Sequence, residues 1–203
     1  HRLATPSGRI ELYSSTVDGF GYDDCPGHAV WREPREWLGS SLAGRFPLHL
    51  LSPQPADKLH SQYDHGSVSR AGKVSDRAPL WMNPADAAAR GIQDGTVVRV
   101  FNDRGSCLAG AVLTDGLIPG VVQLPTGAWF DPSDPGQAHS LEKHGNPNVL
   151  TPDRGTSRLA QSPTCNSTLV QVSRFTGAVP PVTAFDPPAT VNVSGLPGPK
   201  HLS

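Results

Sequence analysis

The sequence lacks most of the features that would place a protein quickly in one functional class. Its three cysteines, Cys25, Cys107 and Cys165, are odd in number and far apart, so they fit neither a disulfide framework nor a zinc site. No apolar run approaches the roughly 18 residues that a membrane helix needs, so no membrane span is predicted. The 17 basic and 18 acidic side chains nearly cancel, which argues against a broad nucleic-acid surface.

Familiar catalytic motifs are also missing from the sequence. It contains no Gly-x-Ser-x-Gly nucleophile elbow, no glycine-rich dinucleotide fingerprint after a strand and no Walker loop. Four histidines, His60, His65, His139 and His144, could hold a metal in a hydrolase, but their spacings match no common metal motif. A metal-dependent hydrolase therefore stays open only as an alternative interpretation.

Glycine and proline, by contrast, are abundant at 21 residues each, and they separate short apolar runs. Runs rich in β-formers predict several short strands, with a brief additional strand at 9–13. The fold class indicated by this pattern is mainly β, a barrel with a few short helices. The predicted barrel strands are 48–51, 97–101, 107–114, 121–124 and 168–172.

One helix and one turn are predicted in detail. Asn83 is a helix cap, Pro84 suits the first helical position, and Gly91 supplies a left-handed stop, so a two-turn helix is expected over 83–91. Residues 102–105 form a hairpin turn that ends in Gly105. Cys107 lies in an apolar strand-like run and is expected to be a small buried hydrophobe.

Differences in amino-acid composition divide the chain into three parts. Residues 1–44 are broken by glycine and proline and cannot bury much surface alone, although Trp31 and Trp37 are expected to pack against neighbouring structure. Residues 45–175 hold the predicted barrel. Residues 176–203 are rich in proline and glycine and are predicted to be a disordered or loosely docked tail.

Four loops between the strands are rich in Asn, Gln, His, Ser and Thr, with single aromatic residues and glycines. They cover 59–66, 126–132, 144–151 and 155–161. Side-chain amides match the donor–acceptor edges of purines and pterins, and a carboxylate can accept paired N–H donors from an aminopyrimidinone ring. The loops therefore indicate a site for a neutral heterocycle, although the same residue types also make ordinary turns.

Read together, these segments resemble the C-terminal portion of the molybdenum oxidoreductases of the dimethyl sulfoxide reductase family. The closer likeness is to the branch of biotin sulfoxide reductase, trimethylamine N-oxide reductase and dimethyl sulfoxide reductase. It runs from about residue 5 to about residue 174, and the tail after Phe175 shows none of it. The segments that carry it are 5–14, 22–28, 83–87, 100–105 and the four loops.

The resemblance implies a double-psi β-barrel over 45–175 that binds bis(molybdopterin guanine dinucleotide), with the molybdenum ligated outside this chain. It also implies a set of cofactor-binding residues, whose amide, hydroxyl and imidazole groups fit that role independently. These residues are Ser52, Gln54, His60, Ser61, Gln62, Trp129, Asp131, Asn146, Asn148 and Gln161.

The implied function is that of the C-terminal part of an enzyme that reduces S-oxides or N-oxides by oxygen-atom transfer. The metal-ligating serine of this branch lies far upstream, so we expect no turnover from the chain alone, and its partners are the remaining domains of the oxidoreductase. Residues 1–44 would then be the exit from the preceding domain. An alternative is a non-catalytic barrel that binds nucleotides or a partner protein and has lost the molybdenum role.

Overall fold

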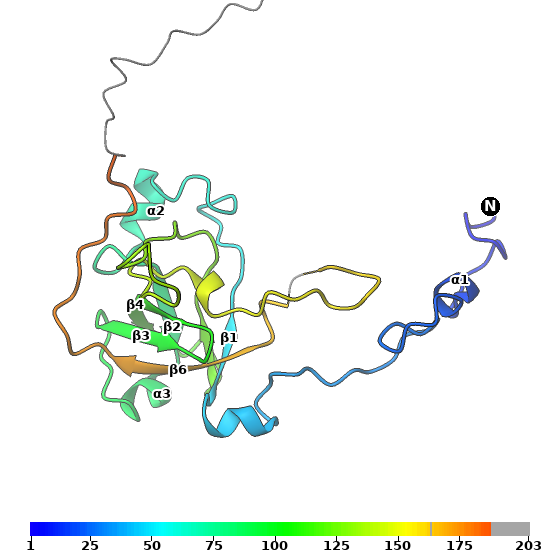
Figure 1. The fold of residues 1–203 in the computed structure, drawn as a ribbon, viewed down its shortest axis with the longest axis horizontal. Coiled ribbons are helices and arrows are strands. Elements are labelled where there is room, and N and C mark those ends of the chain that lie inside the picture. The colour runs from blue at the N-terminus through cyan, green and yellow to red at the C-terminus, as the bar shows by residue number, and fades with distance from the viewer. Residues whose placement is uncertain (163, 188–203) are drawn as a thin grey trace, which may run out of the picture.

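A closed barrel of six strands forms the centre of the molecule in the computed structural model, which describes residues 1–162 and 164–187 (Figure 1). Around the ring the order is β1-β5-β2-β4-β3-β6, and β6 pairs with β1 to close it. The pairs β1–β5 and β2–β4 are parallel, and the other four pairs are antiparallel. The strands are β1 (Leu48–Leu51), β2 (Pro79–Met82), β3 (Val97–Phe101), β4 (Ser106–Leu113), β5 (Val121–Gln123) and β6 (Thr168–Arg174).

The helices of the described residues are all short. They are α1 (Ser15–Asp18), α2 (Ser67–Ala71), α3 (Pro84–Ala88) and two 3₁₀ turns, η1 (Ser41–Gly44) and η2 (Pro147–Val149). Within the described ranges, none has the length and apolar character that crossing a bilayer requires. The predicted fold class, a mainly β double-psi barrel with a few short helices, is confirmed.

The five predicted barrel strands are present, with ends that differ by one or two residues. The sequence analysis missed β2, which begins at Pro79, a residue that is tolerated at the first position of a strand. The strand predicted at 9–13 is wrong, because only Tyr13 forms an isolated bridge, with His28. That segment has no neighbouring sheet to supply a ladder of hydrogen bonds.

Helix α3 begins as predicted and ends earlier. The Asn83 side chain accepts a hydrogen bond from the Ala85 amide at 2.9 Å, and Pro84 occupies the first turn. The α-helix stops at Ala88, and turn-type bonds continue the chain to Gly91, which has the positive φ of +63°.

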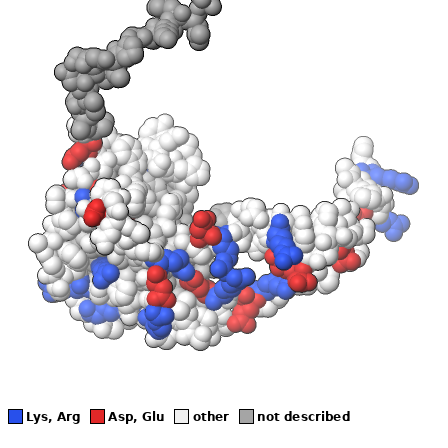
Figure 2. Space-filling model, viewed as in Figure 1, with Lys and Arg blue, Asp and Glu red and all other residues white. Residues whose placement is uncertain are grey.

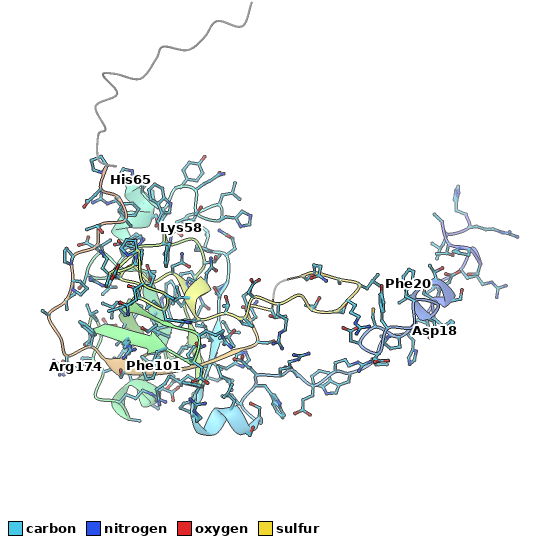
Figure 3. The ribbon with its side chains drawn as sticks, viewed as in Figure 1. Asp18, Phe20, Lys58, His65, Phe101 and Arg174 are labelled. Carbon is cyan, nitrogen blue, oxygen red and sulfur yellow. The ribbon has the colours of Figure 1, made fainter. Side chains whose placement is uncertain are left out.

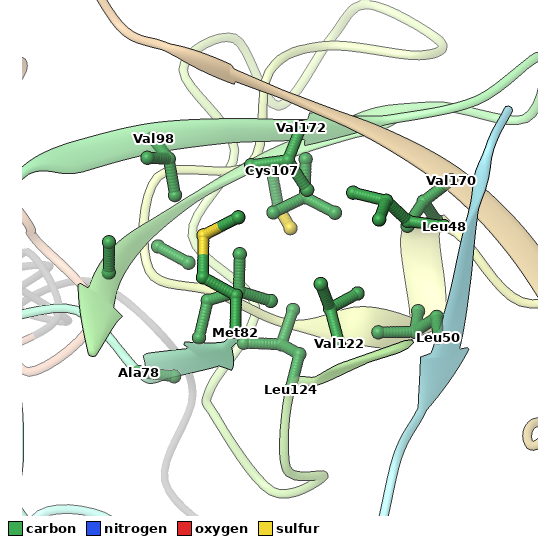
Figure 4. Packing of buried hydrophobic residues seen from close by; sticks show 14 of the residues in the cluster. Leu48, Leu50, Ala78, Met82, Val98, Cys107, Val122, Leu124, Val170 and Val172 are labelled. Carbon is green, nitrogen blue, oxygen red and sulfur yellow. The ribbon is translucent and has the colours of Figure 1, made fainter. Parts of the chain in front are cut away.

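The barrel interior is filled by aliphatic side chains that alternate along the strands (Figure 4). Leu48 and Leu50 of β1 are fully buried while the residues after them are partly exposed, and Val98 and Val100 of β3 repeat the pattern. Cys107 is fully buried and free, as predicted. This core fixes the positions of the strand ends from which the functional loops leave.

Residues 1–44 form an extended arm that leads away from the barrel (Figure 1). Apolar side chains on it are exposed: Ile10 is 79%, Leu12 86% and Trp31 84% accessible. The expectation that Trp31 packs against neighbouring structure is therefore wrong for the chain as it stands. Figure 2 shows basic and acidic side chains alternating along the arm, and Glu36 ties its base to the barrel through Arg104 at 2.6 Å.

The segment that follows β6 runs along the outside of the barrel toward the end that carries α2 (Figure 1). Its residues 176–187 are described, and Thr183 and Phe185 within it contact barrel loops. The rest of the predicted tail, residues 188–203, lies outside the described residues.

Candidate functional site

A hollow of about 640 Å³ opens where three loops meet at one end of the barrel. Strands β1 and β5 are parallel neighbours, so the loops that leave their carboxyl ends emerge side by side. The segment around η2 supplies the third wall. The lining residues are His60, Ser61, Thr126, Gly127, Ala128, Trp129, Phe130, Asn146 and Asn148.

The loop after β1 is held in shape by its own polar groups. The Gln54 amide donates to the Lys58 carbonyl at 2.7 Å, and its oxygen accepts from the His60 backbone N–H at 3.3 Å. A Cβ on Gly127 would lie 2.0 Å from the His60 carbonyl oxygen, and Gly127 has a φ of +101°. Only glycine permits this approach, which brings the loop after β5 against the loop after β1.

Trp129 is fixed by contacts on several sides. Its indole Nε1–H donates to the Ser61 carbonyl at 2.8 Å, and its backbone N–H donates to Oδ2 of Asp64 at 3.1 Å. Nδ1 of His144 contacts the Trp129 carbonyl at 2.9 Å. The indole remains 39% exposed, so it offers part of its surface to the hollow.

Two asparagines line the hollow but differ in what they are free to do. The Asn146 side chain donates to the Ala128 carbonyl at 2.8 Å and accepts from the Asn148 amide at 2.9 Å, which caps η2. The exposed Asn148 side chain makes no hydrogen bond to any described residue. Asn146 therefore shapes the wall, and Asn148 presents a donor and an acceptor at its surface.

A buried carboxylate lies beneath this wall. Glu142 is inaccessible to solvent, and its oxygens accept the backbone N–H groups of Asp131, His144, Gly145 and Asn146 at 3.2, 3.0, 2.7 and 2.8 Å. Burial raises the pKa of Glu142 to about 7, against the lowering effect of these four N–H groups. The sharp turn that presents Asn146 is thus formed around one acidic side chain.

A second buried carboxylate supports the loop that carries His60. Asp64 is inaccessible and forms ion pairs with Lys58 at 3.0 Å and Lys73 at 2.8 Å. Burial alone would raise the pKa of Asp64, but Lys73, Lys58 and the Trp129 amide outweigh it, so the pKa is lowered. Burial has the opposite effect on the ammonium of Lys73 and lowers its pKa, although Asp64 opposes this lowering. Figure 3 labels Lys58 and His65 at this end of the molecule.

Three of the residues implied by the resemblance lie outside the lining of this hollow. Asp131 is buried, and its carboxylate contacts Thr183 and Lys143, not the hollow. The Ser52 backbone N–H donates to the Asn166 side chain at 2.9 Å. Gln161 lines a separate hollow beside the arm, where its amide donates to the Ser157 carbonyl at 3.0 Å.

The structure therefore brings half of the predicted set together around one hollow. His60, Ser61, Trp129, Asn146 and Asn148 line it; Ser52, Gln54, Gln62, Asp131 and Gln161 do not. Sequence reasoning did not name the lining residues Thr126 and Phe130, although their position in the 126–132 loop pointed to them. It also missed the supporting carboxylates Asp64 and Glu142, for which the sequence carries no distinguishing signal.

The lining fits a neutral, hydrogen-bonding ring better than a metal ion or a charged phosphate alone. It combines side-chain amides, hydroxyls and two aromatic rings, and it holds no Lys, Arg, Asp or Glu. Its volume lies within the roughly 300–1,000 Å³ usual for small-molecule sites. Across the described ranges no three His, Cys, Asp or Glu side chains come together to hold a metal, so the four histidines do not form such a site there.

A protein-family model matches the residues that build this site. A family model described as "Molydopterin dinucleotide binding domain" matches residues 48–169. The chain is similar to the dimethyl sulfoxide/trimethylamine N-oxide reductase of Cereibacter sphaeroides, with 48% identity over 186 residues. It is also similar to the trimethylamine-N-oxide reductase of Salmonella typhi, with 49% identity over 189 residues. Each match covers 92% of this chain and 22% of the relative, so the chain spans about a fifth of its relatives' length.

The extent of these matches corrects one expectation. Coverage of 92% of a 203-residue chain is about 187 residues, so the likeness cannot stop at residue 174 and includes part of the segment after β6. Among solved structures, acetylene hydratase from Pelobacter acetylenicus is similar in fold, with a TM-score of 0.69 and 22% identity over 86% of this chain and 24% of that one.

Proposed function

This chain belongs to the family of molybdopterin dinucleotide-binding domains, and from that premise we propose that its hollow holds part of the bis(molybdopterin guanine dinucleotide) cofactor of a molybdenum oxidoreductase. The observation that carries the proposal is the hydrogen-bonding lining, without Lys, Arg, Asp or Glu, that three loops contribute. All three loops lie within the residues that the family model matches.

Within the hollow, the residues take two kinds of role. Asn148 and the backbone of the loop after β5 would meet the donor–acceptor edge of the guanine or pterin ring. Trp129 and the 60% exposed Phe130 supply apolar ring surface for stacking. Asn146 and Gln54 act behind them, because their side chains already hold the loops in place.

The bound cofactor would supply oxygen-atom transfer, and the protein would supply binding, orientation and electrostatics. This chain contributes part of the cradle, and the metal ligand comes from outside it. We infer that the whole enzyme reduces S-oxides or N-oxides, since the similar proteins are named as dimethyl sulfoxide and trimethylamine N-oxide reductases.

The partner that fits residues 1–44 is the remainder of such an oxidoreductase. Ile10, Leu12 and Trp31 are exposed apolar side chains that neighbouring domains would cover. The chain spans only 22% of its relatives, which leaves ample polypeptide to cover it. We therefore keep residues 45–175 as the cofactor-binding barrel and residues 1–44 as the connection to the preceding domain.

Titration of the 203-residue chain with molybdopterin guanine dinucleotide, or with GMP as a surrogate, tests this function. We expect amide NMR shifts confined to the loops of His60, Trp129 and Asn148. AMP is the matched control, because adenine lacks the 6-oxo and 2-amino groups of guanine. A folded chain that stays silent at millimolar ligand, and silent again when the upstream polypeptide of the oxidoreductase is added, would favour a barrel that has lost the molybdenum role.

A further inference from the structure

We propose that residues 176–187, here called the C-terminal strap, hold the Trp129 loop in place from outside the hollow, with Thr183 and Phe185 as positioning residues for the cofactor. The proposal rests on the function proposed above. It assigns a role to the segment after β6, which the family model does not match.

The strap is attached to the barrel at its middle. Arg77, only 3% exposed, donates to the Pro180 carbonyl and, at 2.5 Å, to the Ser75 carbonyl. Only Ala78 separates Arg77 from Pro79, the first residue of β2, so this contact anchors the strap to the barrel wall. The strap then continues toward the end that carries α2 (Figure 1).

Thr183 joins the strap to Asp131, near the end of the Trp129 loop (residues 126–132). Its backbone N–H and its hydroxyl each donate to the Asp131 carboxylate at 2.7 Å, to different oxygens. Lys143 completes the group, with its ammonium 3.1 Å from Asp131 and 2.8 Å from the Thr183 hydroxyl. Burial alone would raise the pKa of Asp131, but Thr183 and Lys143 together lower it, so the carboxylate is a charged anchor for the strap.

Phe185 packs directly against the Trp129 ring. The two ring centroids are 5.2 Å apart at 67°, and Phe185 also meets His65 at 5.1 Å and His144 at 5.0 Å in edge-to-face contacts. The ammonium of Lys73 lies 5.6 Å from the Phe185 ring centroid. Phe185 thus contributes an aromatic contact to the Trp129 ring in addition to the hydrogen bond that Ser61 accepts from it.

These contacts act on different parts of one loop. Ser61, which lines the hollow, accepts from the Trp129 indole, and the buried Asp64 accepts from its amide. Phe185 and Thr183 do not line the hollow; Phe185 contacts the Trp129 ring and Thr183 binds Asp131. The buried hydrophobic cluster contains no strap residue among those described. Loss of the strap should therefore loosen the site while the barrel persists.

The experiment compares Phe185→Ala and Thr183→Val with two matched controls on the same strap, the exposed Val179→Ala and Thr176→Val. Hydrogen exchange is measured by NMR at the Trp129 backbone and indole N–H groups, and GMP affinity is measured on the same samples. We expect exchange at Trp129 to accelerate about fivefold to tenfold in Phe185→Ala, with a similar loss of GMP affinity. Thr183→Val should show a smaller change of the same sign, and Phe185→Tyr should restore both readouts.

Unchanged exchange at Trp129 in both variants, with the core amides of Leu50 and Val100 still protected, would overturn the proposal. Equal acceleration in the two controls would overturn it as well, since the effect would then be general to the segment. If the unaltered chain binds no GMP, either alone or with the upstream polypeptide of the oxidoreductase added, the proposed function fails. The strap is still judged by exchange at Trp129. If Phe185→Ala does not fold, Thr183→Val decides, because it removes one hydroxyl and leaves the packing in place.

Discussion

The interior of the barrel and the groups that support the hollow above it are equally buried, although they are made of opposite kinds of side chain. Leu80 and Val100 inside the barrel are fully buried, and so are Asp64 and Glu142 under the hollow. The first region is held by apolar burial, which is non-directional. The second is held by carboxylates that accept N–H groups from lysines and backbone, and each such contact has a direction and a distance.

The difference separates what builds the fold from what builds the site. An apolar core accepts changes that conserve volume, whereas a buried carboxylate requires its own donors and leaves them unsatisfied when it is lost. The walls of the hollow are fixed by the second kind of contact: Asp64 holds the Trp129 amide, and Glu142 forms the turn before Asn148.

The largest effect is expected from Asp64→Asn. The substitution leaves the buried ammonium groups of Lys58 and Lys73 without their carboxylate, and breaking a buried pair in this way costs about 3–5 kcal/mol of unfolding free energy. Urea unfolding measures it. The control is Asp103→Asn, which removes the exposed pair with Arg45 and should change stability by about 1 kcal/mol or less. If the two substitutions lowered the unfolding free energy equally, the buried ion pairs of Asp64 would support the hollow no more than an exposed pair does.

Leu80→Ala should weaken the apolar interior by a comparable or slightly smaller amount. Deleting a buried leucine side chain costs about 2–5 kcal/mol, depending on how far the cavity collapses. Leu80→Met conserves volume and should cost less than about 1.5 kcal/mol by the same urea measurement. If Leu80→Met lowered the unfolding free energy as much as Leu80→Ala, the apolar interior would require its exact side chains, as the buried carboxylates require their own donors.

Glu142→Gln should act through pH. The folded-state pKa of Glu142 is raised to about 7, so its contribution to stability is fully present below about pH 4.5 and is lost as pH rises through 7. The stability advantage of the unaltered chain over Glu142→Gln should therefore shrink between these values, by on the order of 3 kcal/mol. The exposed Glu33→Gln serves as the control and should show no such trend. An advantage that grew with pH would mean that the carboxylate is stabilised as an anion.

Asn148→Ala should have the smallest effect on the molecule and a selective one on binding. Its side chain supports no described residue, so the melting temperature should not move, while GMP affinity should fall by about 1 kcal/mol for one lost hydrogen bond. Scanning calorimetry measures the melting temperature and calorimetric titration measures the affinity, with the exposed Gln93→Ala as the amide control. A fall in melting temperature with unchanged affinity would place Asn148 among the supporting residues.

The apolar region is also the one that sequence reasoning predicts well. Strands β1 and β3 follow from short runs of β-forming residues, and α3 follows from Asn83 and Pro84. Strand β2 does not, because a four-residue run that begins with Pro79 gives no alternation to detect. Strands with a clear pattern are therefore predictable from local sequence, and a strand formed chiefly by tertiary pairing is not.

The site is predictable in part. The composition of the loops and the family resemblance point to His60, Trp129 and Asn148, which meet at the hollow. The buried Asp64 and Glu142 are indistinguishable in sequence from surface acids, because their burial depends on donors supplied by distant segments. Asp131 was predicted to bind the cofactor, and nothing local to it reveals that Thr183, some fifty positions later, bonds to its carboxylate.

The pairing of β1 with β6 also governs how the barrel comes into being. Leu48 lies opposite Val170, more than a hundred positions away in the sequence, and every other strand of the ring lies between them. Pairing such distant strands costs loop-closure entropy before packing stabilises the pair. We therefore expect slow folding, with ring closure as a late step. During synthesis, the ring cannot close until β6 has left the ribosome, and until then two strand edges remain open to partners other than each other.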